Sequence, residues 1–239
     1  MQKRVPSAAV ELLLQPDNCD NTCDRTRVLR RFFAHYFRQA SRSFPWREPG
    51  VGPFHLLLAE LLLVQTKAVN VVQTRQTLVQ AYPDVKDIAA AKEQTLVRLL
   101  RPLGLQRQRA RALKAVCKAV MSKHAGVIPS DPGDLLALPH VGLYVAAAVR
   151  AFAFRQRTPI VDGNVLRVLG RVVGADFRTD TRRAPDAWRL AWSILPKRKP
   201  QMHNYGLLDF AAQICSRTPQ CGSCGVARFC EFYKRTRSD

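Results

Sequence analysis

The sequence predicts an all-α protein, and three observations support that fold class. Apolar residues recur mainly at helical spacing, as at Leu96, Leu99 and Leu103. No segment alternates apolar and polar residues as a half-buried strand does. Pro, Gly or clustered charges interrupt the helical pattern at four places: residues 45–53, 125–133, 155–159 and 196–200. At ordinary helix lengths, these breaks imply about eight to eleven helices.

The N-terminal segment, residues 1–24, is expected to be loosely ordered because it lacks periodicity and contains Pro6 and Pro16. It also lacks a long apolar stretch followed by a small-residue cleavage site, so no signal peptide is expected. The chain is therefore expected to stay in the reducing cytoplasm, and at the nucleoid if its source is bacterial.

The charge balance predicts a polyanionic partner. The chain has 38 Lys and Arg against 18 Asp and Glu, a formal net charge of +20, which is more than solubility requires. A membrane surface would need an apolar span or a cationic amphipathic helix, and neither is evident in the sequence. Nucleic acid is the favoured partner, and no membrane association is expected.

Four of the seven cysteines crowd into the last 25 residues. Cys215, Cys221, Cys224 and Cys230 form the pattern C-x5-C-x2-C-x5-C, whose four thiolates suit an iron–sulfur cluster or a tetrahedral zinc ion. Zinc sites usually consist of two C-x2-C pairs, so the cluster is favoured, with zinc and unliganded thiols as the alternatives. The other cysteines are interpreted as two free thiols and one core residue: Cys19, Cys23 and Cys117.

The segment from Asp134 to Ala148 is interpreted as a helix, a tight turn and a second helix. Pro139 and Gly142 bracket the turn, so the second helix begins beside a residue without a side chain. Unsatisfied N–H groups and the helix dipole favour an anion there, which makes this helix start a candidate site for a DNA phosphate. Taken alone, the pattern also fits an ordinary helical hairpin.

Asp162 follows this hairpin, at the expected N-terminus of an apolar helix. The ordinary role of Asp at such a position is to cap the helix. That role is compatible with catalysis, because a carboxylate fixed by helix N–H groups stays ionised and can face a cation.

Four motifs in order carry a family resemblance: LPHVGLY, VDGNVLRVLGR, NYGLLDFAAQIC and the cysteine cluster. They resemble the endonuclease III and adenine-glycosylase branch of the helix-hairpin-helix DNA glycosylases, from about Phe44 to Tyr233. Within that branch, FPWR, AELLLVQT and LGLQRQRARAL resemble the mismatch-specific thymine glycosylases most.

The resemblance implies two helical domains with the active site in the cleft between them. A six-helix barrel that contains the helix-hairpin-helix would span residues 54–156, and residues 25–53 and 157–239 would form the domain that holds a 4Fe–4S cluster. The implied activity is that of a base excision repair enzyme, a monomer that cuts the N-glycosidic bond of a mismatched base in double-stranded DNA.

The implied mechanism uses three catalytic residues on a base flipped out of the stack. Asp162 would stabilise the positive charge that develops on the sugar, and Glu60 would protonate the leaving base. Apolar neighbours one helical turn away place Glu60 on a buried face, where its pKa should rise; a pocket-edge carboxylate is the alternative. Tyr144 occupies the slot of the lysine nucleophile of strand-nicking relatives, so no Schiff base can form there and a monofunctional enzyme is expected. A core tyrosine is the alternative for Tyr144.

The resemblance also implies the DNA contacts. Gln65 and Leu105 match positions that enter or border the gap left by the flipped base, although either could simply pack. The hairpin would supply the remaining contacts: Pro139, His140, Val141, Gly142 and Val145. An arginine-rich stretch would line the phosphate path or form a solvated helix face: Arg98, Arg101, Arg107, Arg109, Arg111 and Lys114.

Several departures from the family pattern bear on specificity. His140 replaces the first hairpin glycine, where a positive φ disfavours a side chain, and the first cysteine spacing is x5 where relatives usually have x6. The chain ends nine residues after Cys230, and Gln106 and Arg107 replace the Tyr-Tyr pair of adenine glycosylases. These features favour thymine or uracil opposite guanine; an adenine glycosylase and a catalytically silent DNA-binding protein are the alternatives.

Overall fold

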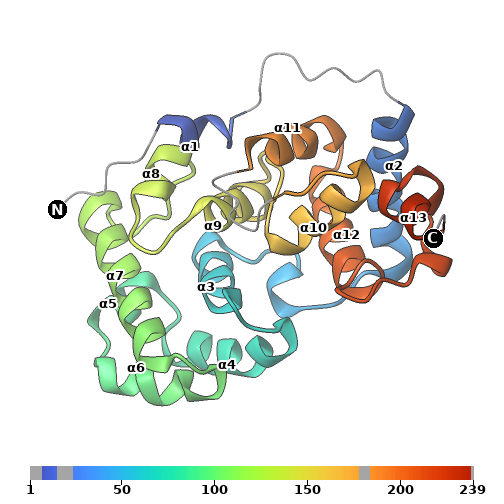
Figure 1. Cartoon of the computed structure of the whole chain (residues 1–239). Coiled ribbons are helices and arrows are strands. Elements are labelled where there is room, and N and C mark those ends of the chain that lie inside the picture. Colours follow the sequence, from blue (N-terminus) through green and yellow to red (C-terminus); the bar gives the residue numbers. More distant parts are fainter. Residues whose placement is uncertain (1–6, 15–23, 178–183, 238–239) are drawn as a thin grey trace. The chain divides into compact units, whose positions relative to one another are not determined.

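The computed structural model describes residues 7–14, 24–177 and 184–237 (Figure 1). These residues form helices and turns and contain no strand, so the all-α prediction is confirmed. The four predicted breaks fall in or beside intervals between helices. The described residues include thirteen α-helices, more than the eight to eleven expected, because five of them have only five or six residues. Cys19 and Cys23 lie outside the described residues.

The described chain divides into two compact units. The first unit is Ser43–Phe154, and the second combines Ser7–Arg42 with Arg155–Asp239. The first unit therefore includes residues 43–53, which the family resemblance assigned to the cluster domain. The reason is packing, since the 3₁₀ turn η1 (Pro45–Arg47) contacts α3 (Pro53–Leu63).

The first unit is built around α3, whose residues Leu56 to Glu60 and Leu62 are buried. This helix contacts α4, α7, α9 and the π-helical turn η3. The elements of the first unit after α3 are α4 (Ala68–Ala81), α5 (Val85–Ala90), α6 (Glu93–Leu100), η2 (Arg101–Leu103), α7 (Gln106–His124), α8 (Pro132–Ala137), α9 (Leu143–Ala148) and η3 (Val149–Ala153). Because α3 is apolar nearly all round, it can only be a central helix.

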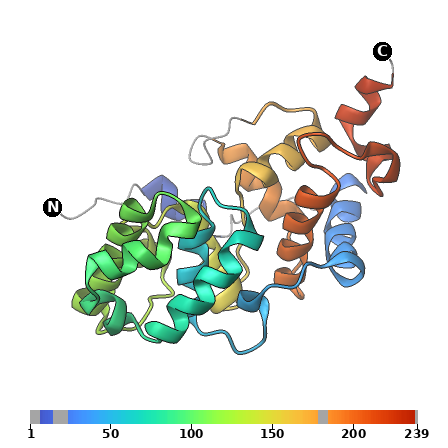
Figure 2. The same ribbon diagram turned by 90° about the horizontal axis from the view of Figure 1, so that it is seen from below.

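In the second unit, α2 (Asp24–Ala40) and α12 (Pro200–Gln213) lie side by side although far apart in the sequence (Figures 1 and 2). A Cβ atom on Gly206 would lie 1.9 Å from the carbonyl oxygen of Phe33, so only glycine permits this approach. The other helices of the second unit are α1 (Ser7–Glu11), α10 (Gly163–Val173), α11 (Pro185–Ile194) and α13 (Glu231–Thr236), with the short turns η5 (Cys221–Ser223) and η6 (Ala227–Phe229).

Part of the N-terminal segment expected to be loosely ordered is structured. Residues 7–11 form α1, Leu13 is buried, and the carbonyl oxygen of Leu12 accepts a hydrogen bond of 3.1 Å from the indole Nε1 of Trp192. A buried leucine and a long-range hydrogen bond give this short stretch tertiary contacts that its composition does not indicate.

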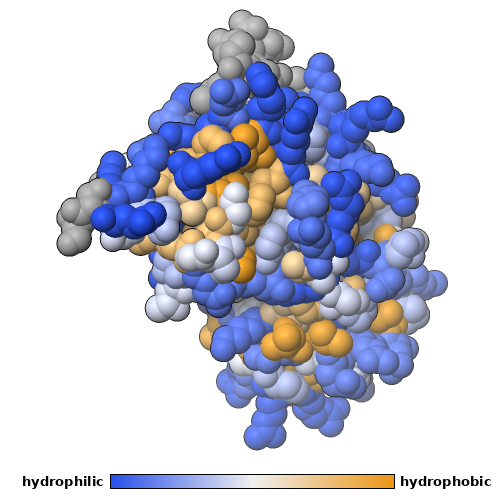
Figure 3. All heavy atoms as spheres, turned by 90° about the vertical axis from the view of Figure 1, so that its right-hand side faces the viewer, coloured by the Kyte–Doolittle hydropathy of each residue, from blue (hydrophilic) through white to orange (hydrophobic). Residues whose placement is uncertain are grey.

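Hydrophilic residues cover most of the face drawn in Figure 3, and hydrophobic side chains gather there only in smaller areas. Within the described residues, no helix combines the length and the apolar character that crossing a bilayer requires.

Candidate active site and DNA interface

Asp162 caps α10, as its position in the sequence predicts. Its Oδ1 accepts a hydrogen bond of 2.7 Å from the backbone N–H of Val165, and its Oδ2 accepts one of 2.8 Å from Nδ2 of Asn164. The side chain is half-buried. Both carboxyl oxygens are therefore held in a fixed orientation at the positive end of a helix dipole.

A chain of hydrogen bonds continues from Asp162 to the cysteine segment. Asn164 Oδ1 accepts from Nη1 of Arg167 at 2.9 Å. The same guanidinium donates to the carbonyl oxygens of Cys215 (3.0 Å) and Ala211 (2.9 Å), and its burial lowers its pKa. The orientation of the carboxylate thus depends on an arginine that also contacts a cysteine of the predicted cluster.

Arg171, one turn further along α10, braces the cysteine segment. Its Nη1 lies 3.5 Å from Sγ of Cys215 and donates to the carbonyl oxygen of Ser216 at 2.5 Å, and its Nη2 donates to that of Arg217 at 3.1 Å. The Cys230 thiol donates to the carbonyl oxygen of Arg171 at 3.3 Å. One face of α10 therefore supports two of the four cysteines.

The four C-terminal cysteines line one hollow of the second unit. Its empty volume is about 290 Å³, open solvent included, and its wall contains Cys215, Cys221, Cys224 and Cys230 together with Arg171 and Phe232. Within the described part of the chain, no group of three or more Cys, His, Asp or Glu is arranged to hold a single metal ion. Cys117 lies in the core, as predicted, and burial raises the pKa of its thiol to about 12.

Glu60 and Tyr144 belong to the first unit, on helices α3 and α9, which contact each other. Glu60 is buried, with 3% of its surface exposed, as the apolar neighbours one turn away predict. Tyr144 is half-buried in the first turn of α9, which differs from a fully buried core residue. Asp162 belongs to the second unit.

The hairpin is present as α8, a turn and α9. The first i to i−4 hydrogen bond of α9 runs from the N–H of Ala146 to the carbonyl oxygen of Gly142, so the N–H groups of the first turn precede the intrahelical ladder and can meet an anion. The side chains of Val141 and Val145 are buried, whereas His140 and Gly142 are exposed. Of these four hairpin residues, His140 and Gly142 have surface that is open to a DNA contact.

Three residues predicted at the DNA line one open hollow of the first unit: Gln65, Leu105 and His140. Its empty volume is about 670 Å³, open solvent included. All three have positive φ values, of 56°, 49° and 60°, and Leu105 keeps 55% of its surface exposed. The structure thus brings together parts of three loops that lie far apart in the sequence.

Arg109 was predicted to line the phosphate path or lie on a solvated helix face, but the structure buries it. The residue is 8% exposed, and its guanidinium donates hydrogen bonds inward to the two loops that carry Gln65 and Leu105. Arg109 lies four residues before Leu113 and seven before Val116, on the buried stripe of α7. That spacing is the signal in the sequence that could have marked it as an interior residue.

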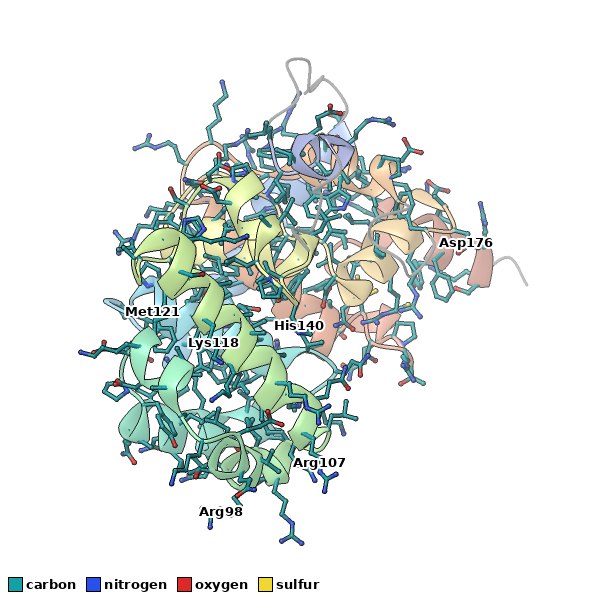
Figure 4. The ribbon with its side chains drawn as sticks, turned by 90° about the vertical axis from the view of Figure 1, so that its left-hand side faces the viewer. Arg98, Arg107, Lys118, Met121, His140 and Asp176 are labelled. Carbon is teal, nitrogen blue, oxygen red and sulfur yellow. The ribbon has the colours of Figure 1, made fainter. Side chains whose placement is uncertain are left out.

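The other members of the arginine-rich stretch differ in exposure. Arg98, Arg101, Arg107 and Arg111 are exposed, and Figure 4 shows Arg98 and Arg107 directed outward from the first unit. Arg111 Nε lies 3.2 Å from Oε1 of Glu93. Lys114 is half-buried and donates to the carbonyl oxygen of Ala91. Only the exposed arginines are placed to meet a phosphate.

Asn164 and Arg167 are functional candidates that the motif analysis did not single out. Both lie inside the VDGNVLRVLGR motif, two and five residues after Asp162. The contacts of Arg167 with residues 211 and 215 join positions more than forty residues apart, which spacing within the motif does not indicate.

The sequence matches known DNA repair proteins over most of its length. The family model of the HhH-GPD superfamily base excision DNA repair proteins matches residues 58–191. The sequence is 31% identical to the thymine/uracil-DNA glycosylase of Methanothermobacter thermautotrophicus. The alignment covers 90% of this chain and 98% of that relative.

An adenine DNA glycosylase of Mycobacterium tuberculosis is 35% identical over 79% of this chain, which spans 62% of that longer protein. Among solved structures, a thermostable thymine-DNA glycosylase superposes with a TM-score of 0.84 at 30% identity, covering 90% of this chain and all of that one.

Proposed function

Because the chain belongs to the HhH-GPD superfamily of base excision DNA repair proteins, we propose that it is a mismatch-specific DNA glycosylase. It hydrolyses the N-glycosidic bond of thymine or uracil mispaired with guanine. The proposal draws on the thymine/uracil-DNA glycosylase that this chain matches along nearly the whole length of both proteins. The proposed enzyme acts as a monomer on double-stranded DNA.

The observation that carries the proposal is the placement of Asp162. Cleavage of the N-glycosidic bond builds positive charge on the sugar, and a carboxylate held in one orientation stabilises that charge without reorganising. Asp162 has one oxygen bonded to a helix N–H and the other to Asn164. A water molecule then adds to the sugar carbon that the base has left.

Glu60 supplies the proton that the departing base takes up. A carboxyl group acts as a general acid in its protonated form. Glu60 is 3% exposed, among the leucines of α3. In this proposal Glu60, Tyr144 and Asp162 act on the flipped base.

The enzyme is monofunctional. Strand cleavage by this family of reactions needs an amine that forms a Schiff base with the abasic sugar, and Tyr144 offers a phenol at that place. Its half-buried ring at the start of α9 is suited to stack on a flipped base or to orient the attacking water.

DNA is held at two places on the first unit. The first-turn N–H groups of α9 receive a phosphate, which fixes the register of the protein on the duplex. Gln65 and Leu105 enter the gap that the flipped nucleotide leaves, and the exposed Leu105 side chain replaces the lost stacking.

We also propose that Cys215, Cys221, Cys224 and Cys230 hold a 4Fe–4S cluster. The four cysteines line one hollow, and Arg171 reaches the Cys215 sulfur. Four soft thiolates are the donor set that such clusters take. When bound, the cluster would hold Cys215 and Cys230 beside Arg171 of α10.

The cluster is tested on the purified protein by its visible absorbance and by its iron, zinc and acid-labile sulfide content. A brown protein with about four irons and four sulfides per chain is expected. A colourless protein that contains one zinc ion would overturn the assignment.

The activity is tested with end-labelled duplexes that carry T·G, U·G, A·G or A·8-oxoguanine, each analysed with and without alkali. Strand breaks that require alkali, strongest for T·G and U·G, are the expected result. Cleavage of the adenine strand would favour the adenine-specific alternative. The similarity to the adenine DNA glycosylase of Mycobacterium tuberculosis is the reason to keep that alternative. No base release from any duplex would favour a catalytically silent DNA-binding protein.

A further inference from the structure

Two loops of the first unit end in strained and exposed residues. Gln65 and Leu105 adopt left-handed backbone conformations, with φ values of 56° and 49°, which cost a residue other than glycine about 1 kcal/mol or more. Both residues are exposed. Such conformations persist only where the surrounding structure holds them, so the loops need a support beneath them.

Arg109 contacts the first loop on both sides of Gln65. Its Nη2 donates to the carbonyl oxygen of Val64 at 3.0 Å and to Oγ1 of Thr66 at 2.6 Å. Its Nη1 donates to the carbonyl oxygen of Leu62 at 3.2 Å. The guanidinium therefore fixes the last turn of α3 and the residues that flank Gln65.

The same residue also holds the second loop. Its Nε donates to the carbonyl oxygen of Gly104 at 3.0 Å, and its backbone N–H donates to that of Leu105 at 2.9 Å. Arg109 thus contacts Leu105 and the residue before it. Two loops forty residues apart in the sequence are joined through one side chain.

The chemistry of arginine suits this role. The planar guanidinium directs its donors outward in a fixed geometry, and hydrogen bonds from a charged donor are stronger than neutral ones. Arg109 is 8% exposed, and burial lowers its pKa. A buried charge is tolerated where it is hydrogen-bonded, and here each of the three guanidinium nitrogens donates to a carbonyl or hydroxyl oxygen.

We infer that Arg109 is a positioning residue, which holds Gln65 and Leu105 in the projecting conformations that open the duplex around a mismatch. It acts through these two residues. The inference rests on the proposed function for what the two loops do. The support of the loops rests on the hydrogen bonds alone.

Three variants test the inference. Arg109→Met keeps an unbranched apolar stem and removes every side-chain donor, and Arg109→Lys keeps the charge but cannot span both loops. Lys118→Met is the matched control, because it removes one charge from an exposed position further along α7 (Figure 4). Thermal unfolding establishes whether each variant is folded. If Arg109→Met does not fold, Arg109→Lys tests whether Arg109 holds the loops.

The first readout uses no DNA. Amide hydrogen exchange should become faster in residues 62–67 and 103–106 of the Arg109 variants, and remain unchanged elsewhere and in Lys118→Met. The second readout compares single-turnover release of uracil from a U·G duplex with release from a single strand, where no partner base is displaced. The paired substrate should lose about 100-fold in rate with Arg109→Met, the single strand far less, and Arg109→Lys should be intermediate.

Unchanged exchange in both loops of a folded Arg109 variant would overturn the inference. So would an equal loss of rate on paired and single-stranded uracil, because a general structural defect does not distinguish the two. If the unaltered protein releases no base at all, the proposed function fails, and the exchange experiment still decides whether Arg109 holds the loops.

Discussion

At the scale of single residues, Tyr144 decides whether the enzyme also cuts the strand. Tyr144→Lys would place an amine in the first turn of α9, where it can attack the abasic sugar and form a Schiff base. We expect strand cleavage without alkali and a covalent protein–DNA complex after borohydride reduction, both detected on gels.

Tyr144→Phe is the control for this substitution, since it keeps the ring, carries no amine and should give no trapped complex. Base release by Tyr144→Lys with neither strand cleavage nor trapping would show that Tyr144 does not face the sugar.

The sequence indicates some site residues better than others, and the difference has a physical cause. The capping role of Asp162 follows from its local sequence, because a cap bonds to N–H groups two or three residues away. Arg109 was misplaced because its partners at residues 62–66 come from another part of the chain. The charge of an arginine predicts an anionic ligand. The actual partners of Arg109 depend on which loops the fold brings next to its side chain.

At the scale of elements, the pairing of α2 with α12 depends on Gly206. In Gly206→Ala, the new methyl group would meet the carbonyl oxygen of Phe33 at 1.9 Å, so the helices must separate. We expect a loss of about 1–3 kcal/mol or more in the free energy of unfolding, measured by urea denaturation.

Gly163→Ala is the matched control for this prediction. It adds the same methyl group inside α10 of the same unit, where nothing lies within 4 Å, and alanine favours the helix. Equal stability of the two variants would mean that α2 and α12 do not pack as closely as described.

The same helix pair should make the stability of the protein depend on pH. His203 is fully buried on α12, with its ring edge-on to Phe33 at 5.4 Å, and burial lowers its pKa to about 4 from an ordinary value of 6.5. Between these two pH values the unfolded chain binds a proton that the folded chain does not. Stability is therefore complete above pH 6.5 and falls as the pH decreases toward 4, by roughly 3 kcal/mol at most.

Denaturation in urea at pH 7 and at pH 5 measures this loss. His203→Gln, which keeps a donor for the carbonyl oxygen of Arg30, should reduce the difference between the two pH values. An equal difference in the variant would assign the pH dependence to other groups.

Element positions were predictable where composition changes sharply, as at the breaks around residues 45–53 and 196–200. The number of helices was underestimated, because helices such as α5 and α13 have only six residues each and their stability comes from packing rather than from their own pattern. For the same reason α1 was not predicted at all.

At the scale of the whole molecule, the fold follows from the family resemblance more than from periodicity. The periodicity indicates helices, whereas the order of the motifs indicates which helices carry the hairpin, Asp162 and the cysteines. The matched family model at residues 58–191 covers the hairpin and Asp162, and the solved thymine-DNA glycosylase has a similar fold. The placement of residues 43–53 in the first unit came only from the packing of η1 on α3.

In the proposed mechanism, the carboxylate of Asp162 stabilises the charge that develops on the sugar. Asp162→Asn removes the charge but keeps an oxygen that can accept the N–H of Val165, so α10 stays capped. The fold and the affinity for a T·G duplex should therefore be retained. The stabilisation of the developing sugar cation should be lost.

The most direct measurement is single-turnover release of thymine from a T·G duplex by the unaltered protein and by Asp162→Asn, with binding measured on the same duplex. We predict alkali-sensitive release by the unaltered protein, a loss of at least about 100-fold in the variant, and similar binding by both. Release that survives in Asp162→Asn, or that disappears together with binding, would contradict the assignment of Asp162 as the catalytic carboxylate.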